Sequence, residues 1–432
     1  MDKMIDILMI SPSNEKLGLF RRFVPRSVPL GLGILSGFLM QNGYNPEIAD
    51  SEIIKINEKF LKSILNKMSL PRIFGISSMT TNASQAFEIA KKIKSLDKDN
   101  FVIMGGIHPT VCPEECLNTG YVDFVVIGEG EHALLSLVTR IKNNKNDFSG
   151  IANIAFKIGN NINFAEPSKE LFNVNEIKMF PYDLFDRNKY DLGFILTSRG
   201  CPYDCIFCSQ RVITKRKYRP RINELVIDEL DYLINHLEQK NITFFDDFFT
   251  GDKKRVFELC KMIRERGLNK KCSFGVQTRG DSVTKEILVE MKNSGFDSMM
   301  LGFETVSDHL MKVINKNETV EDNVNAILLG NEIGLSTEAT FIFGFPEENY
   351  KNRINALHLT RAVELDRARF NIATPYPGTK FYDIAVAQQK LNKADNWDNF
   401  SSAAAVTGSI FKKYKVPYCP EGTKPLDLSG EV

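Results

Sequence analysis

Long hydrophobic runs and an excess of charge are both missing from this sequence. No apolar run approaches the ~18 residues that a membrane-spanning helix needs, so no membrane partner is expected. The 55 basic and 54 acidic residues nearly cancel and leave a net charge of +1. Without a strong positive field, no nucleic-acid partner is expected either.

The first residues also lack the features of a secretion signal. Asp2, Lys3 and Asp6 interrupt a short apolar run, which fits a buried first strand better than a signal peptide. Eight cysteines in a large chain without such a signal indicate a reducing compartment, where thiols bind metals or do chemistry. A cytoplasmic location is therefore expected.

The 432 residues predict two or three domains of the α/β class. Residues 1–145 alternate apolar strands with helices, which predicts a doubly wound, Rossmann-like domain. Residues 146–190 form a less regular connector with one small hairpin. Residues 191–395 contain six further strand–helix units, as in a partial or complete parallel barrel with its chemistry at the carboxyl ends of the strands. Residues 396–432 form a tail without clear periodicity.

Three cysteines lie close together in SRGCPYDCIFCSQ, directly after an apolar strand. Cys201, Cys205 and Cys208 have the spacing C-x3-C-x2-C. Three thiolates fill three corners of a cubane iron–sulfur cluster and leave one iron open to another ligand. A structural zinc site needs a fourth Cys or His, and none lies near in sequence, so zinc is the lesser alternative.

This motif resembles the hallmark of the radical S-adenosylmethionine (SAM) superfamily, including the aromatic Phe207 before the last cysteine. The resemblance implies a 4Fe-4S cluster whose open iron is chelated by the amino and carboxylate groups of SAM. Reductive cleavage of SAM would give methionine and a 5′-deoxyadenosyl radical. A small-molecule substrate and an electron donor such as flavodoxin or ferredoxin are the implied partners.

Later strand ends resemble the SAM-binding elements of the superfamily. Asp246 or Asp247, in FFDDFF, would bind the SAM ammonium through a charge-assisted contact. Arg279, in VQTRGD, would bind a carboxylate or another cofactor group, and Glu304, in LGFET, a ribose hydroxyl. The backbone near Ile342, in FIFGFPEE, would bind adenine, and Phe207 completes this set. The alternative for the charged residues is a helix cap or a surface ion pair.

The N-terminal part resembles the cobalamin-binding domains that are fused to radical SAM cores. PLGLGILSGFLMQNGY, GISSMT, GGIHPT and GEGE occur in the order typical of that family. Small residues after strands let backbone amides approach a large ligand at the carboxyl edge of a sheet. The candidate cobalamin-binding residues are Ser77, Ser78, Thr80, Gly105, Gly106, His108, Gly128, Glu129 and Gly130.

Two familiar ligand motifs are missing from this part of the chain. Gly31, Gly33 and Gly37 do not have the G-x-G-x-x-G spacing of a dinucleotide site. No D-x-H-x-x-G occurs, so no histidine is expected to ligate cobalt, and His108 either lines the pocket or is a satisfied structural histidine. A domain that has lost its ligand is the alternative for the whole region.

The remaining cysteines give weaker signals. Cys112 and Cys116, in VCPEEC, are interpreted as unpaired loop cysteines, with a second metal site as the alternative. Cys260 and Cys272 fit the core of the barrel, and Cys419 lies in the tail.

The resemblance implies a radical SAM enzyme that methylates an unactivated carbon of a small molecule or natural-product intermediate. The chain resembles the class B methyltransferases, in which cobalamin carries the methyl group. The alternative is a dehydration, decarboxylation, cyclisation or rearrangement with cobalamin absent or otherwise used. An iron–sulfur sensing module is a more distant alternative, because a sensor would not need the SAM-binding strand ends. No side chain is assigned as a catalytic residue.

Overall fold

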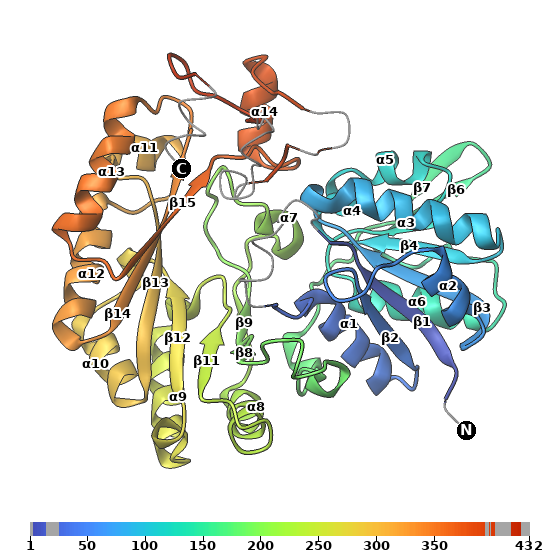
Figure 1. Ribbon diagram of the computed structural model, residues 1–432, viewed down its shortest axis with the longest axis horizontal. Helices are drawn as coiled ribbons and strands as arrows, with labels where there is room; N and C mark the ends of the chain where they lie inside the picture. The colour runs from blue at the N-terminus through green and yellow to red at the C-terminus, as the bar shows by residue number, and fades with distance from the viewer. Residues whose placement is uncertain (1–2, 14–25, 394–396, 398, 402–415, 425–432) are drawn as a thin grey trace. The chain divides into compact units, whose positions relative to one another are not determined.

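The computed structural model describes residues 3–13, 26–393, 397, 399–401 and 416–424 (Figure 1). The chain divides into two compact units, one of Met1–Asp191 with Lys393–Asp398 and one of Leu192–Asn392 with Asn399–Val432. Most of the tail expected at residues 396–432 lies outside the described residues. None of the helices in the described ranges is long and apolar enough to span a bilayer.

The first unit is built on a seven-stranded sheet with the order β2-β1-β3-β4-β5-β6-β7. Strands β1 to β5 are parallel, and the hairpin β6–β7 adds two antiparallel strands at the edge. The strands are β1 (Ile5–Ser11), β2 (Pro46–Asp50), β3 (Met68–Ser77), β4 (Phe101–Gly105), β5 (Phe124–Val126), β6 (Ile154–Ile158) and β7 (Asn161–Phe164). The small hairpin expected in the connector is thus part of the first sheet.

Helices cover both faces of this sheet, as in a doubly wound fold. The helices are α1 (Leu30–Gln41), α2 (Glu58–Leu65), α3 (Ala83–Leu96), α4 (Ile107–Val111), α5 (Pro113–Asn118) and α6 (Glu131–Lys142). Leu8 and Ile10 of β1 belong to the core cluster shared with α2, α3 and α5, whereas Ile7 and Met9 belong to the cluster shared with α1 and α6. Burial on both faces explains why parallel strands such as β1 are continuous apolar runs.

The second unit contains a six-stranded sheet with the order β15-β14-β13-β12-β11-β8, in which every neighbouring pair is parallel. Its strands are β8 (Phe194–Ile195), β11 (Asn241–Phe244), β12 (Ser273–Thr278), β13 (Phe296–Glu304), β14 (Ser336–Phe343) and β15 (Arg367–Ile372). The sheet follows chain order from one end to the other. The predicted partial barrel of six strand–helix units is confirmed.

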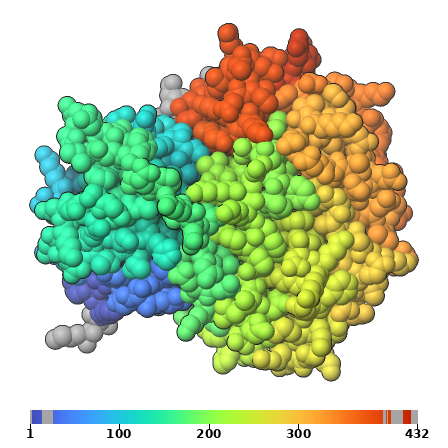
Figure 2. All heavy atoms as spheres, turned by 180° about the vertical axis from the view of Figure 1, so that it is seen from behind, coloured from blue at the N-terminus to red at the C-terminus, as the bar shows by residue number. Residues whose placement is uncertain are grey.

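Helices follow the barrel strands and cover them from outside. They are α8 (Asn223–Asn235), α9 (Lys253–Glu265), α10 (Lys285–Asn293), α11 (Asp308–Val313), α12 (Val320–Ile333), α13 (Tyr350–Ala362) and α14 (Lys380–Ala387). In the space-filling view, the yellow-to-orange part of the chain presents a continuous surface of side chains (Figure 2). Local sequence fixes the helix ends: a capping box of Thr319 and Asp322 begins α12, and Gly334 in a left-handed conformation ends it.

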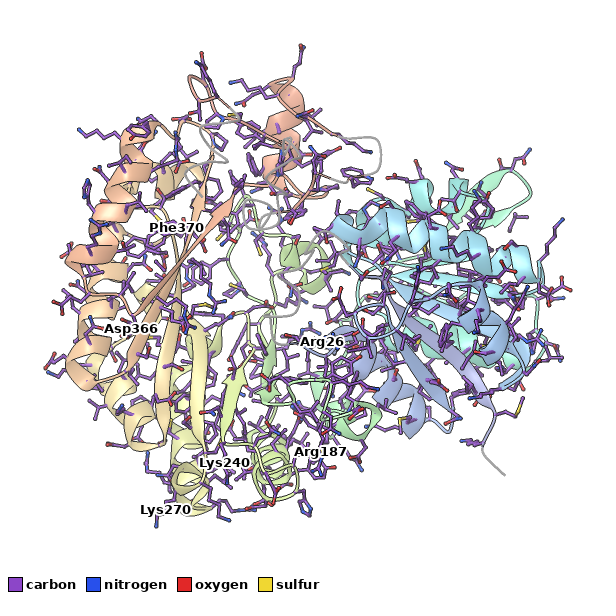
Figure 3. All side chains as sticks on the ribbon, viewed as in Figure 1. Arg26, Arg187, Lys240, Lys270, Asp366 and Phe370 are labelled. Carbon is purple, nitrogen blue, oxygen red and sulfur yellow. The ribbon has the colours of Figure 1, made fainter. Side chains whose placement is uncertain are left out.

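The two ends of the barrel strands carry different kinds of residue. Lys240, Lys270 and Asp366 precede β11, β12 and β15 and mark the amino ends of these strands (Figure 3). The cysteine motif instead follows β8, Asp246 and Asp247 follow β11, and Glu304 is the last residue of β13. These functional candidates therefore lie at the carboxyl ends, where chemistry occurs in parallel barrels.

Candidate functional site

The cysteine motif lies in a loop between β9 (Ser198–Arg199) and α7 (Gln210–Thr214). β9 pairs antiparallel with β10 (Arg219–Pro220), which closes the base of this segment. The backbone N–H of Ile206 donates to the carbonyl of Ile314 at 3.0 Å, and the N–H of Phe381 donates to the carbonyl of Ile206 at 3.0 Å. Backbone bonds to segments far along the chain therefore fix the loop.

The three cysteines of this loop are partly buried, and none of them is in a disulfide. Burial raises the pKa of Cys205 to about 11, and the nearby charges of Lys316 and Arg279 act in the opposite direction. Across the described ranges, one group of three or more His, Cys or acidic side chains has all its ligand atoms within 4.8 Å of one another, and that group lies in the first unit. The thiols of Cys201, Cys205 and Cys208 do not form a group of this kind in the structure.

Arg279 holds the cysteine loop in place from the end of β12. Its guanidinium lies 3.5 Å from the centre of the ring of Tyr203, which stands between the first two cysteines in the sequence. It donates to both carboxylate oxygens of Asp281, at 3.0 and 2.9 Å, and to the carbonyl of Lys316 at 2.8 Å. Burial opposes its charge, but Asp281 and Glu318 raise the pKa of Arg279 overall.

Glu304, at the end of β13, belongs to a buried ionic network. Lys316 lies 3.4 Å from Glu304 and 3.0 Å from Glu318, measured between the ammonium nitrogen and a carboxylate oxygen. Burial raises the pKa of Glu304, and the charge of Lys316 opposes that rise. Glu304 also has a positive φ of 66°, which is uncommon for a residue with a side chain. Sequence reasoning missed Lys316 and Glu318, because no motif marks them.

The two adjacent aspartates after β11 have different environments. Asp246 is fully buried, and its carboxylate accepts from the N–H of Thr197 at 2.7 Å, from the Thr197 hydroxyl at 2.6 Å, and from the N–H of Ser198. Asp247 is exposed and accepts from the N–H of Gly200 at 3.1 Å and from the Gln210 amide at 3.2 Å. Asp246 thus anchors the strand that leads into the cysteine loop, while Asp247 contacts both ends of that loop.

Phe207 links the cysteine loop to the segment that follows β14, the strand that contains Ile342. The ring of Phe207 packs against that of Phe345, with 5.4 Å between the ring centres. Ile342 is partly buried in β14, and its backbone lies in register with Asn371 of β15. The structure thus brings Phe207, Asp247, Arg279 and Glu304 to the surroundings of the cysteine loop, with Ile342 at the end of β14.

The cobalamin candidates lie at the carboxyl edge of the first sheet. Ser77 and Gly105 end β3 and β4 in register with each other. Gly106 has φ +99°, and a Cβ atom on it would lie 2.6 Å from the carbonyl oxygen of Ser78. Ser78 itself is buried, and its N–H donates to the carbonyl of Gly105 at 2.8 Å. Only glycine fits at position 106. This is expected at a sheet edge where the backbone lies close to another backbone segment or to a ligand.

The other candidates of this edge differ in exposure. Thr80 and His108 are buried, with His108 at 0% exposure. Gly128, Glu129 and Gly130 follow β5 and are partly exposed, and a Cβ on Gly128 would meet open space. The small, partly exposed residues at the ends of β3, β4 and β5 fit a large ligand at this edge.

The two units match two known family models. Residues 195–360 match the radical SAM superfamily, and residues 18–138 match the B12 binding domain. An uncharacterised methyltransferase of Pyrococcus horikoshii is 31% identical over 417 residues, which is 93% of this chain and 87% of the relative. The anaerobic magnesium-protoporphyrin IX monomethyl ester cyclase of Rubrivivax gelatinosus is 26% identical over 365 residues, or 81% of this chain and 64% of the cyclase.

A solved structure resembles nearly the whole chain. The radical SAM methyltransferase TsrM of Kitasatospora setae, with cobalamin and a 4Fe-4S cluster bound, superposes with a TM-score of 0.74. The match covers 91% of this chain and 76% of TsrM at 19% sequence identity. At that identity, the likeness shows the fold alone.

The cysteine loop at the carboxyl end of a parallel barrel defines an iron–sulfur enzyme. The chain belongs to the radical SAM superfamily members that carry a B12-binding domain. It is a radical SAM enzyme with a 4Fe-4S cluster, SAM and cobalamin as its cofactors. The family predicted from the sequence is confirmed, and the sensing-module alternative is not supported.

Proposed function

We propose that this enzyme methylates an unactivated carbon of a small molecule. The observation that carries the proposal is the presence, in one chain, of a three-cysteine barrel loop and a glycine-lined B12-type sheet edge. Bound cobalamin supplies a carrier for the methyl group, and the cluster with SAM supplies the radical that activates the carbon. The likeness to a methyltransferase over 93% of the chain supports this reading.

On this proposal, Cys201, Cys205 and Cys208 hold the cluster, and Asp247 binds the ammonium group of SAM. Asp247 is favoured over Asp246, because its carboxylate is exposed, whereas that of Asp246 is fully buried. The carboxylate of Asp247 accepts one hydrogen bond on each oxygen, from Gly200 and from Gln210, and its exposed side can accept a further, charge-assisted hydrogen bond from an incoming ammonium group.

The other SAM contacts are proposed from the neighbours that each side chain has in the structure. Glu304 binds a ribose hydroxyl and is held in place by Lys316. Arg279 positions the loop through Tyr203 and supplies positive charge near the thiolates. Phe207 packs at the end of β14, where the backbone of Ile342 binds adenine.

Cobalamin is proposed to lie at the carboxyl edge of β3, β4 and β5. Ser77, Gly105 and Gly128 would approach it through their backbones. Ser78, Thr80, Gly106, His108, Glu129 and Gly130 complete the candidate set. The reductant is proposed to be flavodoxin or ferredoxin, which a cytoplasmic enzyme would meet, because cleavage of SAM needs one electron from outside.

The test uses protein purified anaerobically with cobalamin supplied, then incubated with SAM and dithionite. Methyl transfer from SAM predicts S-adenosylhomocysteine alongside 5′-deoxyadenosine, both measured by mass spectrometry. SAM with a deuterated methyl group, added to a small-molecule extract of the source cells, should label one product. Formation of neither nucleoside product would contradict the proposal.

A second candidate is a cyclisation, which the 26% likeness to the Rubrivivax cyclase favours. The chain spans 64% of the length of that cyclase, so the likeness to the cyclase supports cyclisation less strongly than the likeness to the methyltransferase supports methylation. In this case, 5′-deoxyadenosine should form without S-adenosylhomocysteine, and no deuterated methyl group should enter the product. The same incubation therefore separates the two candidates.

A further inference from the structure

Helices α4 and α5, which follow β4 in the first unit, bring three different metal-binding side chains together (Figure 1). His108, Cys112 and Glu115 each offer a ligand atom, and these three atoms all lie within 4.8 Å of one another. His108 is on α4, Glu115 is on α5, and Cys112 forms the joint between the two helices. No SAM or cluster residue belongs to this group, and His108 is its one member among the cobalamin candidates.

His108 has a buried ring nitrogen that lacks a hydrogen-bond partner. The residue is 0% exposed, and no partner for its Nε2 is found among the residues that the structure describes. Nε2 lies 3.8 Å from Oε2 of Glu115, which is beyond hydrogen-bond distance. Nε2 therefore lies near another ligand atom of the group without being hydrogen-bonded to it. Unsatisfied buried nitrogens are rare in folded proteins and call for an explanation.

The other ring nitrogen of His108 has a partner that selects a tautomer. Nδ1 lies 3.4 Å from the hydroxyl oxygen of Thr80. A proton on Nδ1 directed at Thr80 leaves the lone pair of Nε2 free to bind a metal. Burial lowers the pKa of His108 to about 4, so the ring is neutral at neutral pH, which is the form that ligates metals.

Glu115 is oriented by a residue from the far end of the chain. Its two carboxylate oxygens accept from Nε1 of Trp397 at 3.0 and 3.2 Å. The ammonium group of Lys393 lies 3.5 Å from the centre of the Trp397 ring, and both residues belong to the same compact unit as α5. Hydrogen bonds of this kind hold carboxylate ligands in position in metal sites.

We propose that His108, Cys112 and Glu115 bind one zinc ion, separate from the cluster cysteines. An imidazole, a thiolate and a carboxylate together suit zinc, whereas magnesium and calcium select oxygen ligands. With Zn–N and Zn–O near 2.0–2.2 Å and Zn–S near 2.3 Å, ligand atoms lie roughly 3.3–3.8 Å apart. The 3.8 Å between Nε2 of His108 and Oε2 of Glu115 already falls within this range, and rotation of the partly exposed Cys112 side chain closes the remaining distance.

Zinc binding converts the Cys112 thiol to a thiolate and releases its proton to solvent. Glu115 has a side chain that is 37% exposed, which gives the ion a path from solvent. Three protein ligands leave the fourth tetrahedral position to water. The ion would tie α4 to α5 directly after Gly105 and Gly106, at the edge proposed for cobalamin.

The test uses the full-length protein with its iron–sulfur cluster in place, equilibrated with Zn²⁺ alone and then desalted. We expect one zinc per chain by mass spectrometry. X-ray absorption at the zinc edge, which the iron does not obscure, should show one sulfur near ~2.3 Å and nitrogen or oxygen neighbours near ~2.0–2.2 Å. A shell of three sulfurs would place the zinc on the cluster cysteines and overturn the proposal.

Variants assign the ligands. Cys112→Ser should lose the sulfur neighbour, and both it and His108→Gln should weaken zinc binding at least tenfold. Glu115→Gln, at a partly exposed position, tests the third ligand with less risk to folding. Cys116→Ala removes the neighbouring buried thiol outside the ligand group and should bind zinc as the parent does. Absence of stoichiometric zinc in the parent, or equal binding by parent and ligand variants, would refute the site.

Discussion

At the scale of single residues, burial decides what the paired aspartates after β11 can do. Asp246 is surrounded by donors from Thr197 and Ser198 and has no exposure to solvent. Burial raises the pKa of Asp246, and the hydrogen bonds from Thr197 oppose that rise. A buried carboxylate is tolerated only when donors replace water. Its role is therefore to hold the strand that leads into the cysteine loop.

Asn substitutions at the two aspartates should separate stability from SAM binding. Asp246→Asn places an amide NH2 group against donors and should lower the free energy of unfolding by about 1–3 kcal/mol. Asp247→Asn should change it by less than about 1 kcal/mol, but should raise the KM for SAM roughly tenfold, since a charge-assisted hydrogen bond is lost. Anaerobic urea unfolding and 5′-deoxyadenosine assays measure the two effects. An unchanged KM in Asp247→Asn would contradict its proposed role.

A second prediction concerns the buried network of Lys316. Lys316→Met leaves Glu304 and Glu318 buried without their shared cation, and should cost about 3–5 kcal/mol of stability. The matched control is Lys312→Met on the exposed side of α11, which should stay within about 0.5 kcal/mol of the parent. Urea unfolding compares the three proteins. Equal stability of both variants would mean that the network contributes nothing to the fold.

At the scale of elements, the alternation of strands and helices could be predicted because parallel strands are buried on both faces. The run IDILMIS of β1 has apolar side chains on both sides of the sheet. In the segment FVIMGGIHPT, the short helix that follows the strand is harder to predict than the strand itself. In the structure the strand ends at Gly105, and α4 begins at Ile107. A single glycine with positive φ makes that turn, and apolar periodicity does not reveal it.

This turn gives a prediction for Gly106. Its φ of 99° and ψ of −172° lie in a region that is essentially restricted to glycine, and a Cβ there would meet the backbone of Ser78. Gly106→Ala should therefore destabilise the first unit by roughly 3 kcal/mol. Gly31→Ala, on the exposed first turn of α1 with open space around a Cβ, should be neutral or stabilise by up to about 1 kcal/mol.

Thermal unfolding of the Gly106→Ala and Gly31→Ala proteins measures this difference. Cobalamin retention after desalting provides a second readout, because Gly106 lies at the edge proposed to bind cobalamin. A Gly106→Ala protein that melts like its Gly31→Ala control would show that the turn can relax at little cost.

At the scale of the whole molecule, the candidate site is predictable only where local sequence determines it. The cysteine spacing and the strand ends at Asp247, Arg279 and Glu304 are local, so motifs reveal them. Lys316 is joined to Glu304 by folding, across 12 positions of sequence. Likewise, Trp397 reaches Glu115 across 282 positions. Contacts of this kind depend on the path of the chain, which apolar periodicity does not specify.

The last prediction follows from the division of the chain into two compact units, because the proposed cluster ligands belong to the second unit and the proposed cobalamin edge to the first. Cys205→Ala removes one proposed cluster ligand from the second unit, so iron content and 5′-deoxyadenosine formation should fall to background. Cobalamin content should stay at the parent level, since the proposed edge at β3, β4 and β5 belongs to the first unit. Cys272→Ala, which alters a buried thiol just before β12, should retain both cofactors. Loss of cobalamin together with iron in Cys205→Ala would show that cobalamin binding depends on the barrel loop.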